Sequence, residues 1–204
     1  MMNADELQLF WRIREGEHAE QEAAVSLLMP VSGPDSEAEF PTSVSFKATE
    51  LRRLDGLPHD LQWSDEDSDL FMSLLDRVTD LSDEAEEVVL DVSDELVQGI
   101  VQLVALVRFK SPWDIEDLVG RDMNVPRDEL EIGDLVALNT RYGFNMAIVV
   151  GLDSIDATVI LLDTVCDAQG TSLLPEHSVL LVNRMSVVSA SFCETELPPE
   201  NRLQ

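Results

Sequence analysis

Five carboxylates stand within the fourteen residues WSDEDSDLFMSLLD, which run from Trp63 to Asp76. Carboxylates at this density can ligate a metal ion, imitate the phosphates of a nucleic acid, or form the solvated side of a helix. Each of these uses requires its own spacing. The residues in and around the stretch therefore distinguish a metal site from a charge mimic and from an ordinary amphipathic helix.

The metal hypothesis is tested by position. An EF-hand calcium loop that began at Asp65 would place its oxygen ligands at Asp65, Asp67, Asp69 and Asp76. The sixth position of such a loop requires glycine for a sharp turn, but Leu70 stands there. The twelfth position requires a bidentate glutamate, and the sequence has an aspartate instead. The spacing therefore predicts neither a metal ion nor another cofactor.

Helix signals account for the same stretch. Ser64 precedes three acidic residues, and Asp67 stands at the third helical position, which is the capping-box pattern of a helix N-terminus. Apolar residues then recur at helical spacing, namely Leu70, Phe71, Leu74, Leu75 and Val78. The pattern predicts an amphipathic helix that begins at Ser64, with Asp69, Asp76 and Asp80 on its polar side.

Charge mimicry is the third hypothesis for these carboxylates. Residues 60 to 100 hold fourteen acidic side chains and one basic side chain, Arg77. Carboxylates one helical turn apart lie about 6 Å from one another, which is near the spacing of successive phosphates in a nucleic-acid strand. A basic groove built for DNA would accept such a surface. The predicted contact residues are Asp65, Glu66, Asp67, Asp69, Asp76, Asp80, Asp83, Glu84, Glu86 and Glu87.

The charge of the whole chain also favours a basic protein as the partner. With 41 acidic and 13 basic residues among 204, the formal net charge is −28. A field of this sign repels phosphate backbones and anionic membranes, so we expect no direct binding of nucleic acid or of a membrane. It attracts a basic protein and makes that association salt-sensitive. Only two of the basic residues are lysines, so halophile adaptation is an alternative origin of the acidity.

Side chains with catalytic potential gather in the segment LLDTVCDAQGTSLLPEHS. Cys166 and His177 there have the residue types of a thiolate pair, and Asp163, Asp167 and His177 those of a metal-ligand set. The segment also contains Glu176. The other histidines stand in no metal or nucleophile motif, and the sequence has no glycine-rich phosphate loop. A ligand-binding regulator or enzyme with a site at residues 163–177 is therefore the alternative to a non-enzymatic protein.

The elements that must position these residues fall into two predicted regions, and residues 1–125 form the first. The spacing of apolar residues from Leu7 to Ile13 predicts a helix, and Pro, Gly and Ser residues predict a loop over about 30–46 with a short weak strand at its end. Leu96 to Phe109 is apolar nearly all round, which predicts a buried helix capped by Ser93.

Residues 111–120, SPWDIEDLVG, complete the first region. Ser111 has the position of an N-cap, Pro112 suits the first helical position, and Asp114 completes a capping box. Gly120 is the C-terminal stop. These signals predict a short helix.

Residues 126–204 change to a β pattern. Short apolar segments bounded by Gly, Asn, Asp or Pro predict a small antiparallel barrel. The run GDLVALNTRYG followed by AIVVGLD resembles the first hairpin of SH3-like barrels, a group that includes KOW and Tudor modules. The resemblance implies a contact loop at Arg141, Tyr142 and Phe144. Because residues 128 to 204 hold twelve acidic and three basic side chains, we predict that this loop contacts protein and not nucleic acid.

These observations together predict an α+β protein with a mostly helical N-terminal region and a C-terminal antiparallel barrel. No apolar run reaches the roughly 18 residues of a membrane span, and the acidic start is unlike a secretory signal, so we expect a soluble intracellular protein. Two cysteines are too few for a disulfide scaffold. The predicted function is that of a non-enzymatic interaction protein, such as an assembly or virion component or an inhibitor, which binds a basic partner or itself.

Overall fold

The computed structural model of the chain describes residues 9–14, 22–30, 37–47, 60–79, 94–115, 118 and 130–189. The chain divides into two compact units. The first unit comprises Met1–Asp76 and Leu81–Lys110. The second comprises Arg77–Asp80 and Ser111–Gln204, so the division follows Lys110 and precedes the predicted boundary at residue 125.

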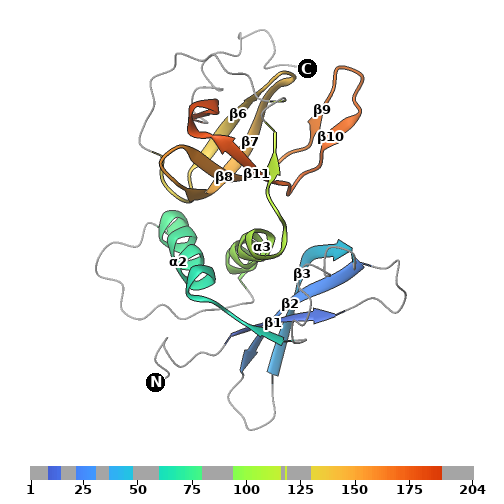
Figure 1. The fold of residues 1–204 in the computed structure, drawn as a ribbon. Helices are drawn as coiled ribbons and strands as arrows, with labels where there is room; N and C mark the ends of the chain where they lie inside the picture. Colours follow the sequence, from blue (N-terminus) through green and yellow to red (C-terminus); the bar gives the residue numbers. More distant parts are fainter. Residues whose placement is uncertain are drawn as a thin grey trace. The chain divides into compact units, whose positions relative to one another are not determined.

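The first unit contains a four-stranded antiparallel sheet in the order β3-β2-β1-β4 (Figure 1). Its strands are β1 (Phe10–Arg14), β2 (Glu22–Pro30), β3 (Glu37–Lys47) and β4 (Asp60–Gln62). Side chains alternate between the two faces of a strand, and Trp11 and Ile13 of β1 are both buried, as are Val25 and Leu27 of β2. These side chains form the sheet's contribution to the core.

The structure corrects two predictions for this region. The helix predicted from Leu7 to Ile13 is wrong, because Phe10–Arg14 form a strand. The loop predicted over 30–46 is also wrong from residue 37 onward, because Glu37–Lys47 form the longest strand of the sheet, and the short strand predicted at the end of that segment lies within it. The proline in that strand, Pro41, is compatible with it because β3 lies at the edge of the described sheet, where a missing N–H need not interrupt a ladder.

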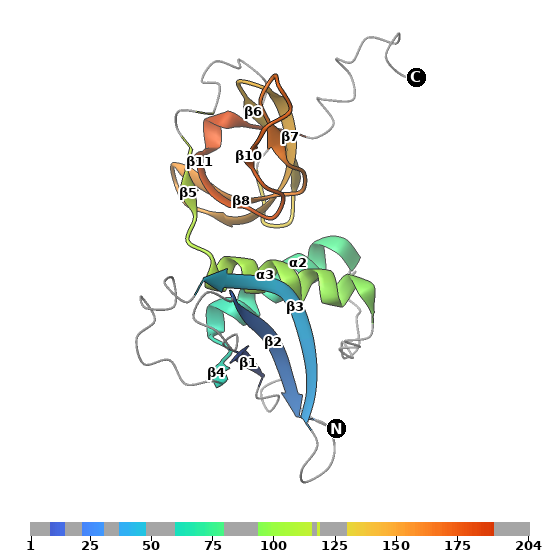
Figure 2. The same cartoon turned by 90° about the vertical axis from the view of Figure 1, so that its right-hand side faces the viewer.

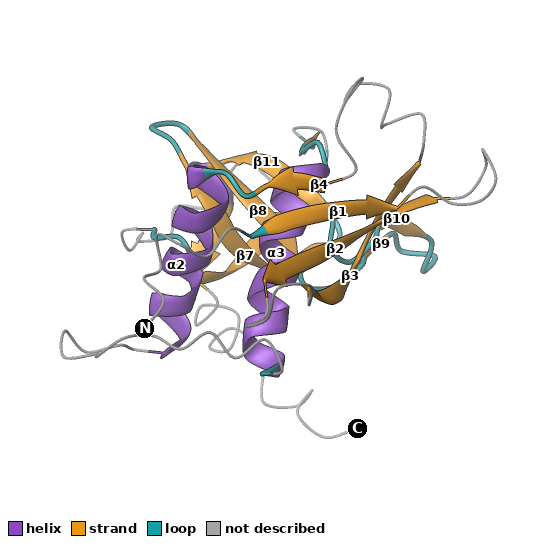
Figure 3. Ribbon diagram, turned by 90° about the horizontal axis from the view of Figure 1, so that it is seen from below, coloured by secondary structure: helices purple, strands orange, loops and turns teal. Residues whose placement is uncertain are grey.

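Two helices lie on one face of this sheet, as Figures 1 and 3 show. They are α2 (Asp65–Thr79) and α3 (Glu95–Phe109), and both were predicted. Ser64 Oγ accepts the backbone N–H of Asp67 at 3.3 Å, and Asp67 Oδ2 accepts the N–H of Ser64 at 3.0 Å, so the predicted capping box is confirmed. At the start of α3 the cap is Asp94 and not the predicted Ser93, because the carboxylate of Asp94 accepts the N–H of Leu96 at 2.8 Å.

Aromatic rings join the helices to the sheet. Trp11 stacks on Trp63 with ring centroids 5.1 Å apart and meets the edge of Phe109 at 5.7 Å. Phe46 of β3 stacks on Phe109 at 5.9 Å. Such pairs contribute about 0.5–1.5 kcal/mol each beyond the burial of their area. The rings therefore fix where α3 ends over the sheet.

The second unit is built on a six-stranded sheet in the order β12-β6-β7-β8-β11-β5. Figure 2 shows that this sheet is strongly curled. Val136, Val149, Val159 and Leu180 belong to the hydrophobic cluster of this unit. Its strands are β5 (Trp113–Asp114), β6 (Leu135–Thr140), β7 (Gly143–Leu152), β8 (Asp156–Leu161), β11 (Val179–Asn183) and β12 (Val187–Ser189), and β9 (Val165–Cys166) and β10 (Ser172–Leu174) form a separate hairpin.

The predicted fold class is wrong. The described chain is mostly β, with three sheets, so the N-terminal part is not a helical region. The six-stranded sheet is not a closed barrel, because β12 and β5 are its two ends and do not pair with each other in the described ladders. Residues 113–114 form β5, parallel to β11, within the segment predicted as a short helix. The first hairpin, β6 with β7, was predicted and is present.

Candidate functional site

The exposed carboxylates of α2 form a stripe along one side of the helix. Asp65, Asp69 and Asp76 are exposed and are spaced by four and seven residues, so they follow one another over about 16 Å of helix length. Met72 falls in the same row and is 44% exposed. We call these four residues the acidic stripe. The opposite side of α2 is buried at Leu70, Phe71, Leu74 and Leu75.

Glu66 flanks the acidic stripe and is also exposed. A side-chain hydrogen bond with Ser64 lowers the pKa of the Glu66 carboxyl, and a backbone hydrogen bond at Glu66 itself lowers the pKa further. The carboxyl is therefore ionised at neutral pH, because a lowered pKa moves its titration further into the acid range. Its negative charge adds to the field at the start of α2, where the helix dipole also favours an anion.

Asp67 has a different role from its neighbours. It is only 5% exposed, although the spacing placed it among the contact residues. Its Oδ2 accepts the indole N–H of Trp11 at 3.2 Å and the N–H of Ser64 at 3.0 Å, and the Nε of Arg108 lies 3.9 Å away. A buried carboxylate with several donors is a structural group. We therefore leave Asp67 out of the contact surface.

The other tryptophan of the stack differs from Trp11. The indole nitrogen of Trp63 is buried and has no hydrogen-bond partner among the residues that the structure describes. An unsatisfied buried donor costs about 1–3 kcal/mol, so the side chain of Trp63 contributes through its ring contacts with Trp11 and Phe71 and not through its indole N–H.

Half of the predicted acidic contact residues lie outside the described residues, namely Asp80, Asp83, Glu84, Glu86 and Glu87. They remain predictions. Cys193, His18 and His59 also lie outside the described residues.

The predicted contact loop of the second unit is the tip of the β6–β7 hairpin. Arg141, Tyr142 and Phe144 are all exposed there. The register pairs Thr140 with Gly143, which leaves Arg141 and Tyr142 as the two-residue turn. Gly143 has φ +127°, a left-handed backbone conformation that glycine adopts without strain. The turn residues therefore point their side chains outward from a well-defined hairpin.

Asp163, predicted as part of a catalytic cluster, supports this hairpin instead. Its Oδ1 accepts the side-chain N–H of Asn145 at 3.2 Å, and its Oδ2 accepts the backbone N–H of Met146 at 3.4 Å. Asn145 Oδ1 in turn lies 3.3 Å from the hydroxyl of Thr140. The carboxylate is thus engaged in holding β7.

The remaining members of the predicted cluster are not assembled either. Asp167 Oδ1 accepts the N–H groups of Gln169 and Thr171 within the β9–β10 turn. Cys166 is an exposed free thiol in the β9–β10 hairpin, where it pairs in register with Ser172. His177 has φ 64° and lies 3.4 Å from the carboxylate of Glu176. Among the described residues, no hydrogen bond joins Cys166 to His177.

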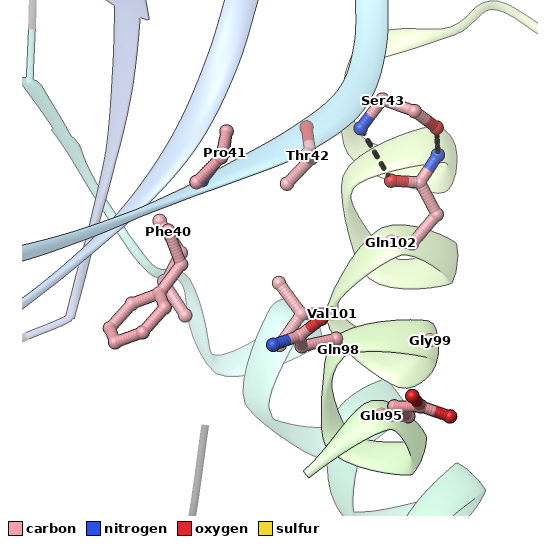
Figure 4. Close-up of a pocket in the computed structure, with 10 residues that line it drawn as sticks. Phe40, Pro41, Thr42, Ser43, Glu95, Gln98, Gly99, Val101 and Gln102 are labelled. Carbon is pink, nitrogen blue, oxygen red and sulfur yellow. Dashed lines mark hydrogen bonds between the residues drawn. The ribbon is translucent and has the colours of Figure 1, made fainter. Parts of the chain in front are cut away.

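A groove in the first unit was not predicted at all. It lies between α3 and the strands β2 and β3, and its volume is about 450 Å³ (Figure 4). The buried side chains Leu27 and Val101 line it, together with the half-buried ring of Phe40. Its polar lining comes from Thr42, Ser43, Glu95, Gln98 and Gln102, and Pro41 and Gly99 complete it.

The groove exists because β3 bends away from α3. The register between β2 and β3 shifts between Ala24 and Ser26, which marks a bulge in β3 just after Pro41. There Gln102 Oε1 accepts the backbone N–H of Ser43 at 2.8 Å, while its side-chain N–H donates to the hydroxyl of Ser43. Figure 2 shows β3 beside α3 at one end and curving away from it at the other.

Sequence reasoning missed the groove residues and Met72. Met72 stands four residues before Asp76 in a helical pattern, so its place in the acidic row was readable from the spacing. Pro41 within an alternating segment was the only local sign of an edge strand with a bulge. Nothing near Gln102 in the sequence indicates its bond to Ser43, because the two residues are 59 positions apart.

In the part of the chain that the structure describes, no three histidine, cysteine or acidic side chains come together as a metal-binding group. The helices of that part include none with the length and apolar character needed to cross a bilayer. No family model matches the sequence, and no curated protein matches it significantly.

Proposed function

We propose that the protein is a non-enzymatic interaction protein that captures a basic protein partner through the acidic stripe of α2. The observation that carries the proposal is the one-sided exposure of Asp65, Asp69 and Asp76 on a helix whose opposite side is buried. Such a row gives directional attraction, because its charges lie on one side of a rigid element.

The rest of the chain adds to this attraction. A net charge of −28 raises the rate at which a basic partner meets the surface, and the attraction weakens as salt screens it. Met72 supplies an apolar contact at the centre of the row, where methionine adapts to the shape of a partner. Assembly of a larger particle and inhibition of a nucleic-acid enzyme both suit such a surface.

The experiment is a capture assay from a lysate of the organism that encodes the sequence, at low and at high salt. The stripe variant carries Asp65→Asn, Asp69→Asn and Asp76→Asn. The charge-matched control carries Glu194→Gln, Glu196→Gln and Glu200→Gln, which change the net charge equally at positions outside the described residues. We expect the wild type and the control to retain one basic partner at low salt, and the stripe variant to lose it.

Equal retention by the two variants would contradict the proposal, and equal loss would show that only net charge matters. Circular dichroism of each protein at low salt provides the folding control. Unfolding of the wild type at low salt would point to salt adaptation, since self-repulsion then dominates.

A further inference from the structure

The groove between β3 and α3 has two chemically different ends. Leu27, Phe40 and Val101 give it an apolar part, while Glu95 stands at the exposed N-terminal turn of α3. In Figure 4 the ring of Phe40 and the carboxylate of Glu95 lie on opposite sides of Val101. Its volume of about 450 Å³ is within the range of sites that enclose small ligands or side chains.

Gly99 adds an observation that internal packing does not explain. A glycine inside a helix costs about 1 kcal/mol relative to alanine. A Cβ atom at Gly99 would meet no atom within 4 Å, so no neighbour in the described structure requires the glycine. Gly99 lines the groove, and the missing side chain leaves room for another backbone to approach α3.

Part of the polar lining of the groove is held in place. Gln102 is fixed by its two hydrogen bonds with Ser43, so the groove is formed before any ligand arrives. Side-chain amides, which both donate and accept hydrogen bonds, form part of this lining. The lining has one ionisable residue, the acidic Glu95, in a chain with a large negative charge.

We propose that this groove binds a short extended segment of the basic partner, in which an apolar side chain is followed by arginine or lysine. The apolar side chain fills the space beside Leu27, Phe40 and Val101, the peptide backbone passes Gly99, and the cation faces Glu95. This inference rests on the proposed function, because it names a second contact for the partner that the acidic stripe attracts.

The test uses three capped tetrapeptides as probes. The first, the Leu-Arg probe, is acetyl-Gly-Leu-Arg-Gly-amide. The Gln probe has Gln in place of Arg, and the Ala probe has Ala in place of Leu. Each is titrated into the full chain labelled with nitrogen-15, and the backbone signal of Gly99 and the side-chain amide signals of Gln98 and Gln102 are followed. We expect saturable shifts of these signals with the Leu-Arg probe, and two- to fivefold weaker binding of the Gln probe because an exposed ion pair is lost.

Two variants test the placement. Gly99→Leu is expected to occupy the space beside Gly99 and to weaken binding at least tenfold, while its helix remains intact because a Cβ atom there meets no atom within 4 Å and leucine favours a helix more than glycine does. Glu95→Gln is expected to remove the preference for the Arg probe over the Gln probe and to leave the binding of the Gln probe unchanged.

Shifts confined to Asp65, Asp69 and Asp76, or no shifts at all, would overturn the groove proposal and leave the acidic stripe as a separate matter. The opposite result is also possible, in which the signals of the groove residues shift with the peptide while the stripe variant still captures its partner. That result would support peptide binding in the groove and refute the role proposed for the acidic stripe. The two proposals therefore fail in different experiments.

Discussion

The indole nitrogen of Trp11 donates to the carboxylate of Asp67 across 56 positions of sequence, with a distance of 3.2 Å between nitrogen and oxygen. This bond ties the sheet of the first unit to the start of α2. Asp67 also accepts the N–H of Ser64, so the same residue takes part in the cap of α2 and anchors the helix to the sheet.

Trp11→Phe and Trp63→Phe remove the same atoms from two stacked rings, and they make a matched pair. We expect Trp11→Phe to lower the free energy of unfolding by about 1–3 kcal/mol more than Trp63→Phe, because it removes one of the hydrogen-bond donors to the buried carboxylate of Asp67. Trp63→Phe removes a donor that has no partner among the described residues. Urea unfolding of both variants measures the difference, and equal losses would contradict this reading of the stack.

Gln102→Leu should expose the backbone N–H of Ser43 to exchange. The Gln102 side chain accepts this N–H at the bulge of β3, so its loss is expected to cost about 1 kcal/mol. Hydrogen exchange at residue 43 should accelerate about fivefold, the factor that corresponds to this free energy. Ser43→Ala is the control, since it removes the hydroxyl but retains the backbone bond. Unchanged exchange in Gln102→Leu would show that the bulge does not depend on α3.

Asp163→Ala should loosen the β6–β7 hairpin that carries Arg141 and Tyr142. The substitution removes the acceptor for Asn145 and Met146, and we expect a loss of about 1 kcal/mol with faster amide exchange in β7. Asp163→Asn keeps one carbonyl oxygen and should lose less. A variant that keeps full stability but loses a measured turnover would instead restore a catalytic role for Asp163.

Asp153 gives a prediction for pH. Backbone hydrogen bonds from Asp156 and Ile155 lower the pKa of its carboxyl below the ordinary 3.8. A group whose pKa is lower in the folded state stabilises the fold above its unfolded pKa, and this stabilisation disappears as the pH falls through the folded pKa. The stability difference between wild type and Asp153→Ala should therefore be full near neutral pH and shrink below about pH 4.

Two measurements check this expectation. A carbon-13 titration of the Asp153 carboxyl should give a midpoint below that of an aspartate in a short peptide. Urea unfolding of wild type and Asp153→Ala across the acid range should show the difference shrinking. A midpoint above the peptide value would mean that the turn does not favour the charged form.

The helices were predictable because their signals are local. Ser64 and Asp67 stand three residues apart and cap each other, and the apolar residues of α2 and α3 repeat within single turns. Strand β1 was not predictable in this way, because Trp11 and Ile13 fit a helical spacing equally well. Only the pairing of β1 with β2 and β4 distinguishes the two structures, and that pairing is not local.

The same argument applies to β5 and to the site. Ser111, Pro112 and Asp114 form a good local cap, but pairing of Trp113 and Asp114 with β11 overrides it. The row of Asp65, Asp69 and Asp76 followed from spacing alone. The groove did not, because it depends on a bulge in β3 and on a helix that comes much later in the chain.

The parallel pairing of β5 with β11 has a consequence for synthesis on the ribosome. β5 leaves the exit tunnel before every other strand of its sheet, and its partner β11 follows only after β6 to β10. The intervening hairpins can form at once from neighbouring segments, whereas β5 must wait for a distant loop to close. We expect this two-residue strand to join the nascent sheet late, and a ribosome stalled before residue 179 to hold a chain in which Trp113 has no partner strand.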